Sequence, residues 1–214
     1  MKSEDKKLLI RSDIINGLAA YKDKLAGKYF LYVFDDRYIE VFFGRDNFKH
    51  LTGVASYLNG ENFYSKVEKS KLTTKQFWFT NDNPFRTAKD KCSRLGRLPE
   101  LVSDDTILME EIITDSCTYS FGTTNLDFSV GFTERTRRVK DGADITVPHQ
   151  YVPRTLRVKD KFFEKSKDVY EVDYIFAKDN DLIKYDSLLY KNGNNAELPK
   201  EVQAIVDDRF REII

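Results

Sequence analysis

The chain has two histidines, and one of them, His50, lies in a segment suited to proton transfer. An imidazole has an ordinary pKa near neutrality, so it can take or give a proton during a reaction. His50 is expected near the end of a short helix, in Phe48-Lys-His-Leu-Thr-Gly-Val54, with the hydroxyl of Thr52 close by. The alternative is a histidine that only hydrogen-bonds the last carbonyls of that helix. Both interpretations stay open.

A second candidate is Arg154, in the segment Tyr151-Val-Pro-Arg-Thr-Leu156. Pro153 favours an extended backbone here, and a guanidinium can hold a phosphate through two parallel hydrogen bonds, with Thr155 adding a hydroxyl. The alternative is an arginine paired with a nearby carboxylate. We interpret His149, just before this segment, as a surface histidine in a flexible loop. A role as a second acid–base group is the alternative.

A basic helix face is the third candidate. Asn83 and Pro84 predict a helix start, with Asn as the cap and Pro at the first helical position. The predicted helix, 83–97, has one apolar face, and its other face carries four basic residues: Arg86, Lys89, Arg94 and Arg97. A surface of this kind can follow a phosphate backbone. An ordinary solvated face is the alternative.

Composition limits the remaining choices. The 214 residues are 41% hydrophobic, which predicts one domain spanning residues 1–214. Net charge is zero, but Lys66–Leu98 holds nine basic and three acidic residues, and Glu134–Lys167 holds ten and five. These segments can meet a polyanion together, or pair with the acidic segments instead. With two histidines and two cysteines, we expect no metal and no cofactor.

The chain shows no secretory leader and no apolar run approaching the roughly 20 residues of a membrane span. We therefore expect a cytoplasmic protein without a membrane partner.

At the start of the chain, an apolar stripe predicts a helix over residues 1–27: Ile14, Leu18, Tyr21 and Leu25. Two aromatic runs around Asp35-Asp36 then predict a hairpin of strands 29–34 and 38–43. Short helices are expected at 45–51 and 60–70.

The second half is predicted to be rich in strands. Strands 119–123 and 126–132 are separated by a minimal turn, and the second of them alternates as if only one face were buried. Residues 134–146 are polar and predict a mobile loop. A further hairpin is expected from strands 169–177 and 184–190, and a final amphipathic helix over 198–214. The order of elements predicts an α+β fold, with N-terminal helices and a β-hairpin, an antiparallel sheet and a C-terminal helix.

Several of these segments resemble a phage-associated family of nuclease-like domains, grouped with the Barnase–EndoU–colicin–RelE (BECR) fold. The resemblance rests on Phe30-Leu-Tyr-Val-Phe34, Tyr38-Ile-Glu-Val41 and Asn47-Phe-Lys-His-Leu-Thr-Gly-Val54, with 151–155 and 172–190 as looser matches. It spans roughly Ile10 to Lys191. It implies a strongly curved antiparallel sheet and an RNase or toxin-type activity of a bacterial phage or mobile element. The stretch 134–146 looks like an insertion.

Carried over residue by residue, the resemblance makes His50 the family's histidine and Arg154 its arginine, with Thr52 and Thr155 as hydroxyl candidates. The expected reaction is metal-independent RNA cleavage that leaves cyclic phosphate ends. RNA is then the expected partner, with an inhibitor protein (an antitoxin or immunity protein) as a second one. Two other classes stay open: a binding module for RNA or protein without catalysis, and an interaction protein that oligomerises through aromatic edges. The nuclease interpretation requires His50 and Arg154 to share one cleft.

Overall fold

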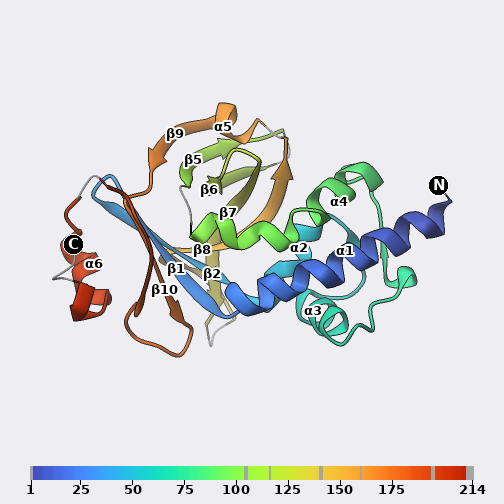
Figure 1. The fold of residues 1–214 in the computed structure, drawn as a ribbon, viewed down its shortest axis with the longest axis horizontal. Helices are drawn as coiled ribbons and strands as arrows, with labels where there is room; N and C mark the ends of the chain where they lie inside the picture. Colours follow the sequence, from blue (N-terminus) through green and yellow to red (C-terminus); the bar gives the residue numbers. More distant parts are fainter. Residues whose placement is uncertain are drawn as a thin grey trace.

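The protein has an α+β fold in which a large, mostly antiparallel sheet meets a group of helices (Figure 1). The computed structural model describes residues 2–103, 106–115, 117–139, 142–159, 161–193 and 196–210. In Figure 1, α1 to α4 gather at one end of the molecule, and α6 lies at the other end beyond the sheet. The predicted fold class is confirmed. Among the described residues, no helix is both long and apolar enough to cross a membrane.

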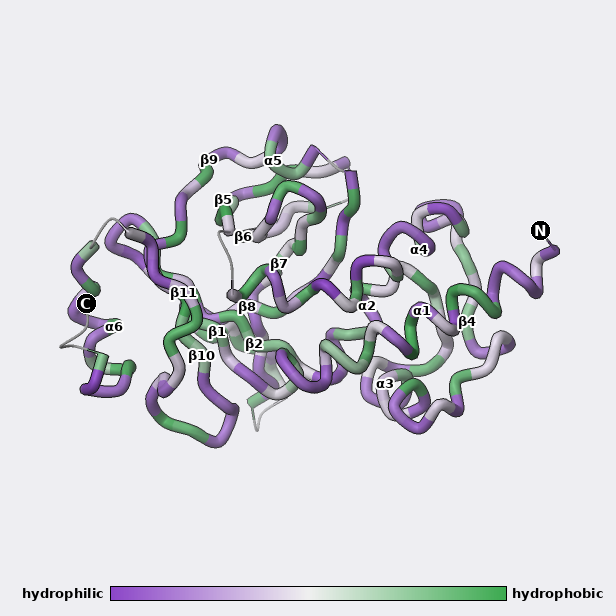
Figure 2. Tube along the Cα trace, viewed as in Figure 1, coloured by the Kyte–Doolittle hydropathy of each residue, from purple (hydrophilic) through white to green (hydrophobic). Residues whose placement is uncertain are grey.

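The first helix, α1 (Ser3–Lys24), is amphipathic, as its stripe predicts. Ile14, Leu18 and Tyr21 are buried along one side of the helix, and most of the other positions are polar, although Leu8 is 51% exposed. The alternation of purple and green along α1 in Figure 2 follows this pattern. Gly27 then adopts a left-handed backbone, with φ of +80°, and turns the chain directly into the sheet.

The predicted hairpin is present as β1 (Lys28–Phe34) and β2 (Arg37–Phe43). Its two-residue turn places Asp35 and Asp36 at positive φ, a conformation that the short polar side chain of Asp tolerates better than most. β1 is buried over every residue but its first, because other strands flank it and both of its faces are covered. The two strands of this hairpin lie inside the sheet, away from both of its edges.

Within the described residues the sheet has nine strands, in the order β11-β10-β1-β2-β8-β7-β6-β5-β9. The later strands are β5 (Ile107–Ile113), β6 (Thr118–Thr124), β7 (Phe128–Arg138), β8 (Asp144–Val158), β9 (Ser166–Glu171), β10 (Tyr174–Asp179) and β11 (Ser187–Lys191). Neighbouring strands are antiparallel except β2 and β8, which run parallel where Glu40 pairs with Gln150 and Val41 with Tyr151. This parallel pair joins the N-terminal hairpin to the later strands.

The prediction of a mobile loop over 134–146 was wrong for the described part of that stretch. β7 continues to Arg138, β8 begins at Asp144, and Thr136 pairs with Thr146 in a projecting two-stranded ribbon. Residues 140 and 141 of the predicted loop lie outside the described residues. The ribbon is mostly exposed and rich in polar and charged residues, and even its Ile145 is 44% exposed, so its composition resembles that of a loop.

The one-sided strand predicted over 126–132 was also wrong in two respects. Leu126 lies in the turn before β7 and is 75% exposed, whereas the whole run from Phe128 to Phe132 is buried. The second face is covered because Tyr119 and the ring of Phe162, from the short helix α5 (Phe162–Lys165), pack over Gly131. The alternation of large apolar residues in the sequence therefore marks only the face of the strand that packs on the main core.

The predicted strand 169–177 is two strands in different places. β9 pairs with β5 at one edge of the sheet, while β10 pairs with β1 near the other, and the chain crosses between them at Val172 and Asp173. The hairpin of β10 with β11 is confirmed. The predicted helix 198–214 is shorter: α6 spans Lys200–Ile205 and a single 3-10 turn, η4, spans Asp208–Phe210. Residues 211–214 lie outside the described residues.

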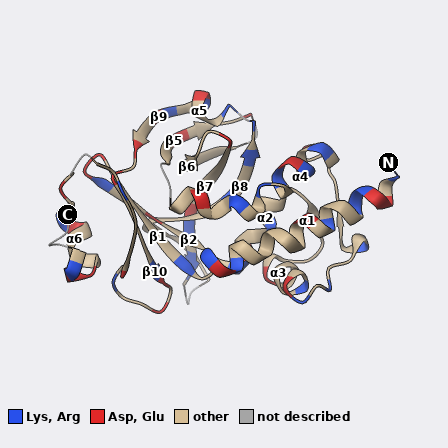
Figure 3. Ribbon diagram, viewed as in Figure 1, with Lys and Arg blue, Asp and Glu red and all other residues tan. Residues whose placement is uncertain are grey.

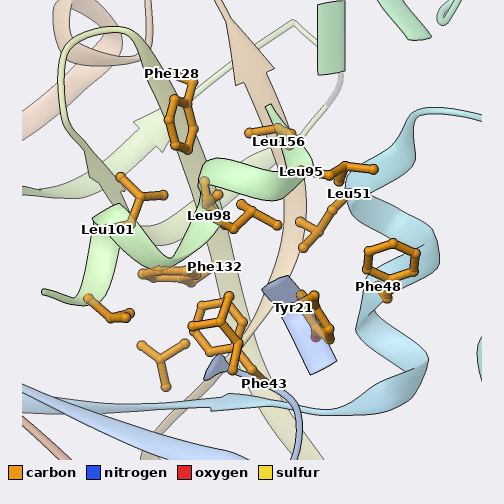
Figure 4. Packing of buried hydrophobic residues seen from close by; sticks show 14 of the residues in the cluster. Tyr21, Phe43, Phe48, Leu51, Leu95, Leu98, Leu101, Phe128, Phe132 and Leu156 are labelled. Atoms are coloured by element: carbon orange, nitrogen blue, oxygen red, sulfur yellow. The ribbon is translucent and has the colours of Figure 1, made fainter. Parts of the chain in front are cut away.

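Between α1 and the sheet, short elements form the helical end of the molecule. They are η1 (Arg45–Asn47), α2 (Phe48–Thr52), β3 (Ala55–Ser56), α3 (Gly60–Glu68), η2 (Thr74–Gln76), β4 (Phe77–Trp78), α4 (Phe85–Cys92) and η3 (Leu95–Val102). The short helices predicted at 45–51 and 60–70 are thus confirmed. Figure 4 shows Leu51 of α2, Leu95 of η3 and Phe132 of β7 in one buried cluster with Tyr21, whose ring packs against Phe43 and Phe48. That cluster fixes α2 against the sheet.

Candidate active site

His50 is held at the surface of α2 by the two residues that anchor this helix. Phe48 and Leu51 are fully buried, so the intervening Lys49 and His50 point away from the core and are half-buried. Gly53 ends α2 in a left-handed conformation with φ of +72°. His50 therefore lies one turn from the end of a short helix, as its sequence predicts.

Arg154 reaches the same place from β8, 104 residues further along the chain. The register of β8 against β7 shifts between Gly131 and Phe132, where Pro153 lies opposite Phe132, and Arg154 projects to the surface beside this irregularity. Its Nη1 lies 3.1 Å from Nε2 of His50. The structure thus brings the two principal candidates into direct contact.

The two side chains lie in a cleft of about 610 Å³. Its walls come from α2 and the residues after it, the loop before α4, α4 itself, β8 and the start of β6. Four cationic side chains line the cleft together with His50: Lys49, Lys91, Arg154 and Arg157. The only carboxylate among its described lining residues is Asp82. Blue positions recur along α4 and β8 in Figure 3. Such a cleft attracts anions.

The surroundings of His50 lower its pKa from the ordinary 6.5 to about 4. Burial contributes most, and the positive charges of Arg154 and Lys49 add to it. The imidazole is therefore neutral at pH 7. Since the Arg154 guanidinium can only donate hydrogen bonds, Nε2 of His50 is the acceptor and its proton is on Nδ1. A neutral imidazole with an accepting Nε2 is ready to take a proton.

Replacing Arg154 with glutamine is expected to raise the pKa of His50, because the substitution removes a positive charge that disfavours the imidazolium. The imidazole resonances of the two histidines report this directly in an NMR pH titration. In the unmodified protein, His50 should titrate near pH 4. In Arg154→Gln it should titrate at a higher pH, still below 6.5 because the burial remains, and His149→Ala assigns the resonances. An unchanged His50 titration would mean that the two side chains do not interact in solution.

The two candidate hydroxyls differ in their accessibility. Thr155 is largely buried but lines the cleft beside Arg154. Thr52 is fully buried, and its Oγ1 donates to the carbonyl of Lys49 at 2.7 Å and accepts from the amide of Val54 at 3.4 Å. Thr52 therefore completes the end of α2 beneath His50, and Thr155 is the hydroxyl that faces the cleft.

Sequence reasoning missed two cations of the cleft. Lys91 is 5% exposed, and its Nζ donates to Oδ1 of Asn83 at 2.8 Å. It lies on the buried side of α4 with Ala88 and Cys92. A lysine on an otherwise apolar helix face is unusual, and this could have identified Lys91 from the sequence. Arg157, three residues after Arg154, stacks over the ring of Phe162 and lines the cleft. Arg157 could have been identified from the sequence by its position directly after the segment that contains Arg154.

The predicted basic helix 83–97 differs from the observed one. Pro84 occupies the cap position, α4 begins at Phe85 and ends at Cys92, and the Asn83 amide contacts Lys91 instead of capping the helix. Arg86 and Lys89 are exposed on α4. Arg94 and Arg97 lie beyond it and both pair with the carboxylate of Asp127, while Arg97 also pairs with Glu100. None of the four predicted basic residues is among the described lining of the cleft.

His149 lies on β8 and not in a flexible loop, which corrects the first interpretation. Its backbone has a positive φ of +58°, and its ring stacks on Tyr38 at a centroid distance of 5.1 Å. Both line a separate hollow of about 450 Å³ that also contains Arg37 and Glu110, paired at 3.0 Å. This hollow is a second place where an acid–base group and a cation meet. Sequence spacing could not reveal it, because its members come from β2, β5 and β8.

The fold and the cleft define a small α+β domain in which a neutral imidazole and a guanidinium meet in a cationic hollow. Residues 13–193 match the family described as phage-Barnase-EndoU-ColicinE5/D-RelE like nuclease 4. The chain belongs to this family, and the resemblance seen in its sequence is confirmed. Comparison with curated proteins and with solved structures gave no significant match. Among the described residues, no group of three or more His, Cys, Asp or Glu side chains is placed to hold a metal ion.

Proposed function

We propose that this protein cleaves RNA without a metal ion and leaves 2′,3′-cyclic phosphate ends. The observation that carries the proposal is the contact of His50 Nε2 with Arg154 Nη1 in a cationic cleft. RNA carries its own nucleophile, the 2′-hydroxyl, so cleavage needs a base, a hold on the phosphate and a protonated leaving group. Membership of a nuclease family supports the same reading.

His50 is the proposed general base. Its Nε2 takes the proton of the 2′-hydroxyl, and the 2′-oxygen then forms a bond to phosphorus while the bond to the 5′-oxygen breaks. Water protonates the leaving 5′-oxygen, and His50 returns its proton to water, so the step consumes no net proton. Because its pKa is low, His50 is fully in its neutral, proton-accepting form at pH 7. The driving force for each proton transfer to it is smaller than for a base of higher pKa.

Arg154 is the proposed phosphate ligand. In the free protein its guanidinium donates to His50, and a bound phosphodiester would take over that donor. The exchange places negative charge beside the imidazole, which favours its protonated form as the reaction proceeds. Thr155 offers a hydroxyl from the same strand, and Lys49 and Arg157 add positive charge around the phosphate. Arg86 and Lys89 on α4 would guide the strand toward the cleft, while Arg94 and Arg97 would first have to leave Asp127.

The proposal includes a toxin-type role in the cytoplasm of a bacterial host, where an uncontrolled RNase is harmful. An inhibitor protein with an acidic surface would suit the cationic cleft, because opposite charges speed association and cover the site. RNA and this inhibitor are the proposed partners.

A second candidate is an RNA-binding module without catalysis. One observation favours it: the accepting nitrogen of His50 is already occupied by Arg154. If RNA does not displace that contact, the cleft binds a backbone and performs no proton transfer.

The test is incubation of the purified chain with bulk tRNA and mRNA in EDTA, followed by analysis of the fragment ends. We expect fragments with 2′,3′-cyclic phosphate ends, because the 2′-hydroxyl is the nucleophile. Saturable binding of RNA that stays intact over a wide range of pH and salt would support the binding module and contradict the nuclease.

A further inference from the structure

Trp78, the only tryptophan of the chain, is 43% exposed although its neighbour Phe77 is fully buried. The two residues make up β4, so their side chains point to opposite sides: Phe77 into the core and Trp78 outward. An exposed indole contributes little to the stability of the core. Its exposure is informative because of where it lies.

Trp78 lies next to residues that line the cationic cleft. In the small ribbon of β3 and β4, Trp78 is directly opposite Ala55, and side chains of directly opposed residues lie on the same face. Ala55 lines the cleft, and so does Thr80, two residues after Trp78. Trp78 is therefore directly across from one residue of the cleft wall and two residues along the chain from another.

The ribbon that carries Trp78 is fixed in place. The Ser56 hydroxyl of β3 donates to the carbonyl of Gln76, the residue directly before β4, at 2.6 Å. Phe77 contacts Phe79, and Phe79 contacts Phe85 of α4 through edge-to-face packing. A ring on such a support loses little freedom when another ring stacks on it.

We propose that Trp78 is a stacking platform for an unpaired base of the RNA strand whose phosphate lies at His50 and Arg154. The inference rests on the proposed function and deepens it, because it makes single-stranded RNA the substrate. Cationic grooves that follow the backbone, together with aromatic rings on which bases stack, are the two parts used to bind single strands. In a duplex the bases stack on each other, so their faces do not reach an external ring.

The emission of the only tryptophan provides the test, because every change in it reports on Trp78. The probe is a ten-nucleotide RNA of mixed sequence, added to the His50→Ala variant so that it is not cut. Its binding is followed independently by the polarisation of a dye on the RNA. We expect the emission to be quenched in step with binding, and the same RNA annealed to its complement to quench far less. Saturable binding of the single strand with unchanged emission would overturn the inference.

Substitutions give a second measure. Trp78→Ala should weaken binding of the single strand by roughly 5- to 150-fold, the usual effect of removing one base–aromatic stack. Trp78→Phe should retain most of the affinity, because a smaller ring still stacks. Phe163→Ala is the matched control, since Phe163 is exposed on α5 and is not among the described lining of the cleft.

The outcomes separate the two proposals. If the unmodified protein cuts RNA with His50, and Trp78→Ala binds and cuts the single strand equally well, only the stacking platform is wrong. If the unmodified protein neither binds nor cuts RNA, the proposed function is wrong and the platform is rejected with it. If the single strand binds and quenches Trp78 but stays intact in the unmodified protein, the platform holds and the catalytic proposal fails.

Discussion

Replacing His50 with alanine is expected to lower RNA cleavage by about 10²- to 10⁴-fold, the usual contribution of a general base. Its pKa of about 4 leaves the imidazole neutral at pH 7, and its Nε2 points at the guanidinium that would hold the phosphate. RNA binding should change little, because a neutral imidazole contributes little to the attraction of a polyanion. The measurement is single-turnover cleavage of a labelled RNA, with its Kd obtained separately.

His149→Ala is the matched control, since it removes the chain's other imidazole from the hollow around Tyr38. Cleavage by this variant should stay within about threefold of the unmodified protein. The opposite pattern, loss of cleavage in His149→Ala and retention in His50→Ala, would move the active site to the hollow that contains Arg37 and Glu110. His50→Gln tests whether size alone matters: it keeps a polar side chain but cannot accept a proton, so it should be as slow as alanine.

The second large effect is expected at Arg154. Arg154→Ala should lower kcat/KM by about 10²- to 10³-fold, as does the loss of one fixed donor from a site where negative charge develops. Arg154→Lys should recover only part of this, because an ammonium carries the charge without the planar pair of donors that matches a phosphate. The measurement is the kcat/KM of the three proteins for one RNA at fixed ionic strength.

Arg37→Ala serves as the control for Arg154, because Arg37 is a strand arginine engaged with Glu110 outside the cleft. It should leave kcat/KM nearly unchanged. Equal losses in Arg37→Ala and Arg154→Ala would indicate a general dependence on net charge, and no special place for Arg154. Thermal unfolding of each variant separates loss of function from loss of fold.

Local patterns predicted local structure well. The buried stripe of α1, the turn at Asp35 and Asp36, and the end of α2 at Gly53 each depend on residues within a few positions of one another. His50 could be placed near a helix end for the same reason. In these segments, propensity and tertiary packing favour the same conformation.

Pairing between distant segments could not be predicted. The contact of Arg154 with His50 follows from the parallel pairing of β2 with β8, which nothing in either strand specifies. The break between β9 and β10 falls at Val172 and Asp173, and no glycine or proline marks it. Likewise, the sequence could not show that Arg94 and Arg97 are both paired with Asp127, which lies about 30 residues further along the chain.

If the proposed reaction is right, the late synthesis of β8 relative to β2 also determines when the protein becomes active during its own translation. A ribosome extends the chain from its N-terminus, so the helix with His50 and the hairpin of β1 and β2 are synthesised before Arg154 is translated. A nascent chain that ends before β8 carries the proposed base without the proposed phosphate ligand. If the proposed reaction is right, the messenger and the ribosome that make this protein are safe from it until most of the chain has been made.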